Sequence, residues 1–202
     1  PGCMEILERL LERHLLVEEN QKYRLTHAKI QEVLYQELRR PWRQRWHLCA
    51  AQALEAIYAT NTAEQYTQLA HHYFEAGRWK ESLNFALKGV KQAVPAYHNE
   101  EGLGLAKLAL QACDALERYE HNQAMINIQR FDVLAQRVEI YALQGLRERQ
   151  AQDITKMEML AESLEDRHKQ AIALQKKSEL NFRVGKYSEA KEAALKASKL
   201  HQ

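Results

Sequence analysis

LAHHYFEAGRWKESLNFA, residues 69–86, allows two interpretations that lead to different kinds of protein. His71 and His72, followed by Glu75, could begin a metal or acid–base site. The same letters also fit one helix–turn–helix of a repeat array, with Gly77 in the turn. On a helix, adjacent histidines point about 100° apart, whereas zinc hydrolases use two histidines four residues apart with a glutamate beside the first. The segment therefore favours a repeat, and we expect no metal site.

The composition predicts an almost entirely helical protein. Only 7 glycines and 3 prolines occur among 202 residues, well below the average use of about 7% and 5%. Alanine, leucine, glutamate, glutamine, lysine and arginine, which favour helices, are abundant.

Charge and apolar content limit the kinds of partner. The 29 basic and 27 acidic residues nearly cancel, so the chain has no global field for nucleic acid or membrane. No apolar run approaches the roughly 18 residues of a membrane-spanning helix. Cys3, Cys49 and Cys113 form no C-x-x-C pair, which is typical of reduced thiols in a cytoplasmic protein. Because the chain enters a helix almost at once without an initiator Met, we expect a fragment of a larger polypeptide.

Small residues recur around turn glycines as they do in tetratricopeptide (TPR) repeats. Such a repeat is about 34 residues long and consists of two antiparallel helices with small residues where they cross. With Gly77 in the turn, the small or aromatic positions of the repeat are occupied by Ala70, Tyr73, Ser82, Ala86 and Gly89. With Gly185 in the turn, they are occupied by Ser178, Ala190, Ala194 and Ala197, with Asn181 in place of the aromatic residue.

A third unit around Gly145 is less regular. Tyr141 precedes this glycine by four residues, but Gln150 stands where a small residue belongs. The three turn glycines are spaced by 68 and 40 residues, and a helix over 99–116, capped by Asn99, lies between the first two. Its pairing stays open. The predicted fold class is all-α: a TPR-like α-solenoid, a right-handed superhelix of helical hairpins over 63–202.

The first 40 residues differ from the rest. A helix to about His14 is followed by two short strands over 15–26 around Asn20-Gln21, and Thr26 is positioned to cap the next helix. In that helix an inward-facing stripe is expected from Ile30, Val33, Leu34 and Leu38. Helix, hairpin and helix are typical of the C-terminal part of a winged helix over 1–40, and a connecting helix over 41–62 begins at Pro41.

Several local patterns together resemble one known family. Residues 10–56 contain Leu25-Thr26-His27, Arg39-Arg40 and Trp46-His47-Leu48-Cys49-Ala50 in the order in which a signal-transduction ATPase with numerous domains (a STAND protein) closes its winged helix. Residues 69–110 are similar to the start of the helical sensor arm in LuxR-type maltose-regulator-like proteins. Leu25 replaces the usual aromatic residue, and Gly102 replaces the usual alanine. The resemblance implies a sensor segment attached to an upstream ATPase module of the same polypeptide.

RRPWRQRWH, residues 39–47, is a basic cluster with two tryptophans. Guanidinium groups and indoles suit phosphates and stacked bases, but the same helix also lets the indoles pack beneath covering arginines. The candidate cationic residues of this cluster are Arg39, Arg40, Arg43 and Arg45. A charged run over 146–170 is interpreted as a solvated helix face, with a charged docking surface as the alternative.

No motif predicts an enzyme. The GLG at 102–104 follows no strand, the Gly185-Lys186 pair lacks the rest of a phosphate loop, and no nucleophile or spaced Cys/His motif appears. We expect no catalytic residue and no cofactor.

The predicted function is non-catalytic recognition, with a protein or small-molecule effector bound on the concave face of the solenoid. The inward positions of two first helices carry Glu64, Thr67, His71, Phe74 and Glu75, and Ile172, Gln175, Glu179, Phe182 and Arg183. A nucleic-acid-binding module, which uses the winged-helix remnant and the basic cluster, is the less favoured alternative. A purely structural oligomerisation scaffold is another, and no membrane partner is expected.

Overall fold

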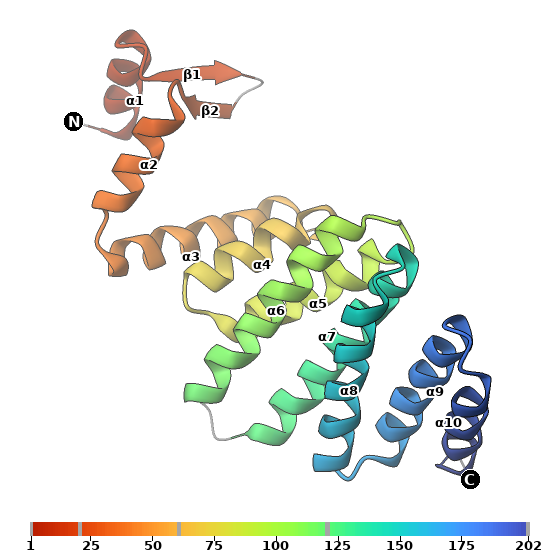
Figure 1. Ribbon diagram of the computed structural model, residues 1–202. Helices are drawn as coiled ribbons and strands as arrows, with labels where there is room; N and C mark the ends of the chain where they lie inside the picture. The colour runs from red at the N-terminus through yellow and green to blue at the C-terminus, as the bar shows by residue number, and fades with distance from the viewer. Residues whose placement is uncertain (1, 20–21, 60–61, 120–121, 201–202) are drawn as a thin grey trace. The chain divides into compact units, whose positions relative to one another are not determined.

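The computed structural model describes residues 2–19, 22–59, 62–119 and 122–200. It divides into two compact units, Pro1–Trp46 and His47–Gln202, which we treat separately. The described part is 82% helical and contains ten α-helices, a 3-10 helix and one two-stranded sheet (Figure 1). The prediction of a mostly helical chain with one N-terminal hairpin is confirmed.

The first unit contains two helices around the hairpin, followed by the start of a third. Strand β1 (Leu16–Glu19) pairs antiparallel with β2 (Lys22–Leu25), with Leu16 opposite Leu25 and Glu19 opposite Lys22. The predicted turn residues Asn20 and Gln21 lie outside the described residues. The helices are α1 (Cys3–Glu12), α2 (Ala28–Glu37) and the first part of α3 (Arg40–Ile57). Pro41 is thus the second residue of its helix, where its missing N–H costs no hydrogen bond.

Two predictions for α2 are wrong. Thr26 does not cap this helix: His27 is the N-cap residue, and the Thr26 hydroxyl donates to the His14 carbonyl instead. The expected inward stripe is not buried, since Val33, Leu34 and Leu38 are exposed. An amphipathic face is buried only if a surface covers it, and α2 packs within its unit against β2, which is four residues long.

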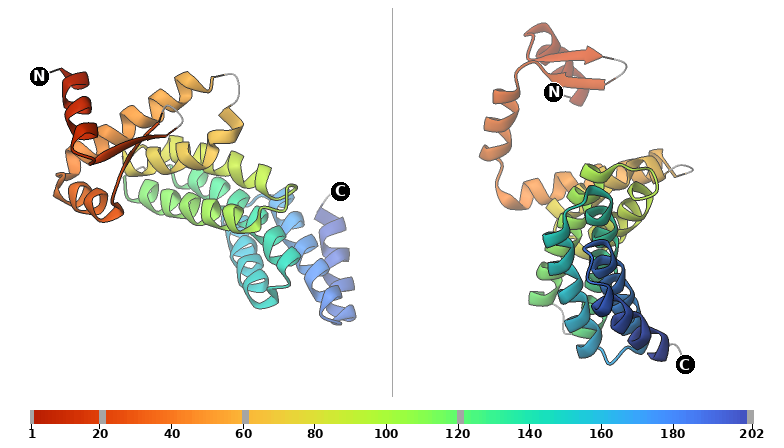
Figure 2. Two further views of the ribbon diagram at one scale, coloured as in Figure 1. Left: turned by 90° about the horizontal axis from the view of Figure 1, so that it is seen from above. Right: turned by 45° about the vertical axis from the view of Figure 1, so that its right-hand side comes forward.

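The second unit is a stack in which each helix packs against the next. After the end of α3 and the 3-10 helix η1 (Thr62–Gln65), the helices are α4 (Tyr66–Glu75), α5 (Trp79–Ala93), α6 (Asn99–Tyr119), α7 (Gln123–Gln144), α8 (Arg147–Ser163), α9 (Arg167–Arg183) and α10 (Tyr187–Leu200) (Figures 1 and 2). Helices also touch the next but one: α4 contacts α6, α5 contacts α7, and α7 contacts α9. The helices therefore alternate between two layers.

A residue in the left-handed conformation reverses the chain after most of these helices. Gly77, Gly145 and Gly185 have φ of 74°, 72° and 80°. After each, the next N–H bonds to a carbonyl five residues earlier, as Arg78 does to Tyr73 at 2.8 Å. This is the Schellman ending, which satisfies carbonyls that the helix leaves unpaired. The three predicted turn glycines are therefore turn residues.

The same ending occurs where the sequence has no glycine. Tyr97 (φ 59°) and Glu165 (φ 51°) take the left-handed position, with bonds from His98 to Ala93 and from Asp166 to Ala161. Because the turn at Tyr97 reverses the chain, α6 forms a hairpin with α5, which settles the pairing that the sequence left open. Asn99 begins this helix but does not cap it, because its buried Oδ1 has no hydrogen-bond partner.

In the first and the last hairpin, a serine hydroxyl forms a hydrogen bond between the two helices where they cross. Ser82 Oγ on α5 donates to the Ala70 carbonyl on α4 at 2.8 Å. Ser178 Oγ on α9 donates to the Ala190 carbonyl on α10 at 2.8 Å. The two residues of each pair have the same spacing from their turn glycine in both hairpins. Serine lies on the second helix of the first hairpin and on the first helix of the last hairpin, and alanine takes the opposite position.

Most of the predicted crossing positions are buried, including Ala70, Tyr73, Ser82, Ala86, Gly89, Ala190 and Ala197. Ala194 is exposed, so its prediction is wrong: α10 turns Ala193 inward instead. Gln150, which breaks the small-residue pattern, is buried and accepts a hydrogen bond from Arg147 Nη1 at 3.0 Å. At Gly102 an added Cβ would lie 2.7 Å from Ile140 Cδ1 and 3.3 Å from Ala93 Cβ, which shows how closely α5 and α7 approach this residue of α6.

We predict that Ala190→Leu lowers the free energy of unfolding by about 1–3 kcal/mol, because the larger side chain overpacks the crossing of α9 and α10. Urea unfolding followed by circular dichroism measures the change. Ala194→Leu, on the exposed face of the same helix, is the matched control and should stay near the wild type. Equal effects of the two substitutions would contradict the observed packing.

Two glycines with open space around them should respond to alanine with opposite signs. Gly145 has a positive φ, and we expect Gly145→Ala to destabilise by about 1 kcal/mol. Gly104 lies inside α6, and Gly104→Ala should stabilise by about 0.5–1 kcal/mol, because alanine loses less backbone entropy in a helix. Thermal melting of both variants measures the sign, and a stabilising Gly145→Ala would contradict the left-handed turn.

Candidate functional site

The predicted recognition residues of the first hairpin lie on η1 and α4. Glu64 and Thr67 line a pocket of about 230 Å³ together with residues of α5 and α6, and the Thr67 hydroxyl donates to the Glu101 carboxylate. His71 is exposed, Glu75 is half-buried, and Phe74 packs against the hydrophobic core. The pocket thus collects two of the five predicted residues.

The predicted residues of the last hairpin lie on α9. Glu179 and Arg183 line a pocket of about 390 Å³ with residues of α7 and α8, including Glu139 and Arg147. Gln175 donates to Glu179 at 3.2 Å, and Ile172 packs against the core. Phe182 is exposed, with its ring 5.5 Å from that of Tyr187.

The structure does not bring the two sets together in one layer. Helix α4 contacts α6, whereas α9 contacts α7 and so belongs to the layer of α5 and α7. An odd number of steps along an alternating stack separates α4 from α9. The turn glycines alone predict that α4 and α9 are both first helices of a hairpin and lie in the same layer. They do not reveal that an odd number of helices (α6, α7 and α8) separates the two hairpins.

Three histidines gather where α3 meets α4. His47 Nδ1 lies 2.9 Å from His72 Nδ1, and the His71 ring lies 5.8 Å from each of the other two. Burial lowers the pKa of His72, and repulsion from His47 and His71 lowers it further. Within the described ranges, no group of three or more His, Cys, Asp and Glu side chains is placed to hold a metal ion.

The basic cluster lies mainly in the first unit. Arg39 and Arg40 are exposed, Arg43 lies over the Tyr35 ring at 5.3 Å, and Arg45 lies over the Trp42 ring at 5.7 Å. Trp42 and Trp46 remain 51% and 60% exposed. One indole is thus partly covered by an arginine, as the packing interpretation expects, but both keep open surface within their unit.

A third pocket, of about 350 Å³, is lined by α6, α7 and α8; we call it the α6–α8 groove. Arg130, Leu134 and Arg137 follow one another on one face of α7, because residues four and three apart share a helix face. Leu110 and Asp114 of α6 form one wall, and Lys156, Met159 and Leu160 of α8 form the other. The lining is therefore largely aliphatic, with charged groups at its edges.

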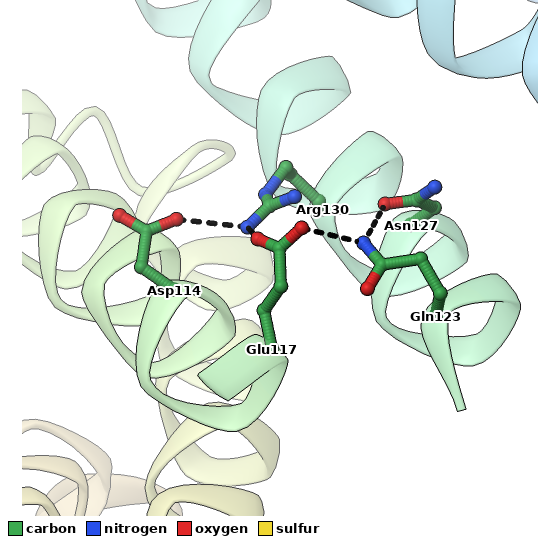
Figure 3. A network of polar contacts seen from close by, with 5 residues as sticks. All are labelled: Asp114, Glu117, Gln123, Asn127 and Arg130. Atoms are coloured by element: carbon green, nitrogen blue, oxygen red, sulfur yellow. Dashed lines mark hydrogen bonds and ion pairs between the residues drawn. The ribbon is translucent and has the colours of Figure 1, made fainter. Parts of the chain in front are cut away.

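At one end of the groove, Arg130 is held by two carboxylates of α6. Its Nη2 donates to Asp114 and to Glu117, each at 2.8 Å (Figure 3). Gln123 donates to the other oxygen of Glu117 and to Asn127, which ties the network to the start of α7. Burial lowers the pKa of Arg130, but the hydrogen bond to Glu117 and the attraction of Glu117 and Asp114 together outweigh this effect, so the pKa is raised.

At the other end, Arg137 binds a buried carboxylate. Its Nε and Nη2 donate to the two oxygens of Asp153 at 2.6 and 2.8 Å, and Lys156 Nζ lies 3.6 Å from the same carboxylate. The Asp153 side chain is 3% exposed and that of Arg137 15%. Burial would lower the pKa of Arg137, but the bonds to Asp153 outweigh it, so the pKa is raised and the guanidinium stays charged.

The sequence patterns did not predict this groove. The run over 146–170 is not simply a solvated face, since Gln150, Asp153, Ile154, Met157 and Ala161 are all buried. The available signal was the spacing of Arg130, Leu134 and Arg137, which places two cations around a leucine on one helix face. The buried acceptor opposite them could not be recognised among the many acidic residues of the run.

Comparison with family models, with curated proteins and with solved structures found no match for this chain. In the part of the chain that the structure describes, no helix is both long enough and apolar enough to cross a lipid bilayer.

We predict that Asp153→Asn destabilises the fold by about 3–5 kcal/mol, because it leaves the buried Arg137 without its counter-charge. The double substitution Arg137→Met with Asp153→Leu should recover most of this loss, since no unpaired charge remains. Asp114→Asn, at an exposed pair, is the control and should cost less than about 1 kcal/mol. Chemical denaturation measures all three, and a double variant no better than Asp153→Asn would contradict the argument.

Proposed function

We propose that the chain is a non-catalytic recognition module, the sensor arm of a STAND-type regulatory ATPase. In this proposal, the stacked hairpins continue as a right-handed TPR-like superhelix, and the N-terminal unit is the end of a winged helix. The order of the sequence patterns in residues 10–56 and 69–110 supports the family, and the sequentially packed helices with Schellman turns support the repeat architecture.

The observation that carries the recognition role is the α6–α8 groove. It combines aliphatic lining with charged groups that ion pairs already hold in place. Binding sites are typically concave and largely apolar, with a few fixed polar groups that orient the ligand. Because the charged groups are pre-ordered, a ligand does not have to immobilise them, which improves affinity.

A ligand in the groove would change the spacing of the helices that line it. The groove is lined by α6, α7 and α8, so a bound effector contacts helices from both layers of the stack. A ligand that prefers one spacing of these helices shifts the population toward it. In the proposed parent protein, that shift is the signal passed to the upstream ATPase module.

One observation favours the nucleic-acid alternative. Trp42 and Trp46 keep open surface beside Arg43 and Arg45, and exposed indoles with guanidinium groups are suited to stacked bases and phosphates. This surface belongs to the N-terminal unit and is separate in sequence from the groove residues. Substitutions can therefore test the two functions independently.

The test is a ligand screen with site-specific variants. We expect members of a mixed library of small anions, cations, neutral compounds and peptides to raise the melting temperature of the wild type; a ligand at a hundred times its Kd contributes about 2.7 kcal/mol of stability. Met159→Trp, which fills the groove from an exposed position, should remove the effect, whereas Arg183→Ala, at another pocket, should leave it unchanged.

Labelled single-stranded and duplex oligonucleotides test the alternative in parallel. The proposal expects them to bind weakly and with no sensitivity to Arg43→Ala. Tight binding that falls steeply with salt and is lost in Arg43→Ala, together with an empty library screen, would replace the recognition proposal by the nucleic-acid module.

A further inference from the structure

We propose that the α6–α8 groove binds a small organic acid: an anionic head group on an apolar aryl or alkyl body. This inference rests on the proposed recognition function and names the chemistry of its ligand. The head group lies between Arg137 and Lys156, and the body lies over the aliphatic lining.

The charge at the Arg137 end favours an anion. Two cations, Arg137 and Lys156, share the single carboxylate of Asp153, so this end carries one excess positive charge. Asp153 itself is buried, and an anion that displaced it from Arg137 would leave its carboxylate buried without a counter-charge, so a bound anion adds to this pair and does not replace it.

Hydrogen-bond donors remain at this end after the internal pairs are formed. Arg137 uses Nε and Nη2 for Asp153, and among the described residues its Nη1 has no hydrogen-bond acceptor. Lys156 Nζ is 3.6 Å from the nearest Asp153 oxygen, beyond normal hydrogen-bond length, and its side chain is 58% exposed. A carboxylate or similar oxyanion can accept from both groups.

The opposite end does not offer the same attraction. Arg130 is placed between Asp114 and Glu117, so the three side chains together carry one excess negative charge. The two ends lie about 10 Å apart along α7, at a rise of about 1.5 Å per residue. The polarity of the groove therefore fixes the direction of the ligand: its charged head lies at the Arg137 end and its apolar body points toward Arg130.

The middle of the groove accounts for the apolar body. Leu110, Leu134, Met159 and Leu160 line it, and Met159 is 65% exposed. The volume of about 350 Å³ lies at the lower end of the range for small-molecule sites. Because the Arg137 side chain is only 15% exposed, water screens its attraction for an anion less than it would at an open surface.

The experiment uses three probes with the same phenylbutyl body and different head groups: 4-phenylbutyrate, 4-phenyl-1-butanol and 4-phenylbutylamine. Titration calorimetry and NMR shifts of the full chain measure each affinity. We expect 4-phenylbutyrate to bind with an affinity of about millimolar and the alcohol about tenfold more weakly, since the alcohol lacks the charge-assisted hydrogen bonds. The amine should bind most weakly.

Two variants and one control place the binding in the groove. Lys156→Met keeps the length of the side chain and removes its charge, so phenylbutyrate affinity should fall about tenfold toward that of the alcohol. Met159→Trp should abolish binding of the anion and the alcohol. Lys107→Met, at an exposed residue of α6 outside the groove, should leave all affinities unchanged. Circular dichroism melts confirm that each variant is folded.

Several results would overturn the inference: equal affinity for the butyrate and the alcohol, tightest binding of the amine, no saturable binding of any probe, or binding unaffected by both Lys156→Met and Met159→Trp. These outcomes leave the proposed recognition function standing if the library screen finds a ligand of other chemistry whose stabilising effect Met159→Trp removes. A screen without hits would overturn the function itself.

Discussion

The second unit depends on how each helix ends. A helix can pack against its successor only if the chain reverses within a few residues and the last carbonyls of the helix still find hydrogen-bond donors. The left-handed residue at Gly77, Tyr97, Gly145, Glu165 and Gly185 does both at once. Where this geometry recurs, neighbouring helices become antiparallel, and their small residues meet at the crossings.

Buried charge is the second constraint on the stack. The crossings near the first and last turn glycines are closed by alanine and by serine hydroxyls, whereas α7 and α8 are joined by Arg137 and Asp153. A buried ion pair contributes little net stability compared with apolar packing, but it tolerates only one alignment of its partners. Here that alignment also fixes the positions of the cations at the edge of the α6–α8 groove.

The sequence predicts local structure well where a residue type has one structural role. Glycine after a helical pattern indicates a left-handed turn, and two short segments on either side of the turn residues Asn20-Gln21 indicate a hairpin, so Gly77, Gly145, Gly185 and the two strands were predictable. Tyr97 and Glu165 were not, because residues with a Cβ seldom adopt a positive φ and carry no turn signal. Without these two turns, the number of helices between the first and last hairpins is not predictable, and neither is the layer to which α9 belongs.

The site was harder to predict than the fold. Val33, Leu34 and Leu38 show that an apolar stripe indicates a face able to pack but not whether anything covers it. Asp153 shows the converse, since one carboxylate in a charged run is buried only because α7 supplies Arg137 from sixteen residues earlier. Such pairings depend on tertiary contacts that single-sequence periodicity does not contain.

The second unit has two hydrophobic clusters, and they meet next to the α6–α8 groove. One hydrophobic cluster is centred on α4, α5 and α6, and another on α7, α8 and α9, and Leu110 packs against both. The groove lies over this seam, with Leu110 in one wall. A change in the spacing of α6 and α8 therefore alters the groove and the contact between the two clusters together. In the proposed function, a ligand in the groove would thus act at the place where the two clusters meet.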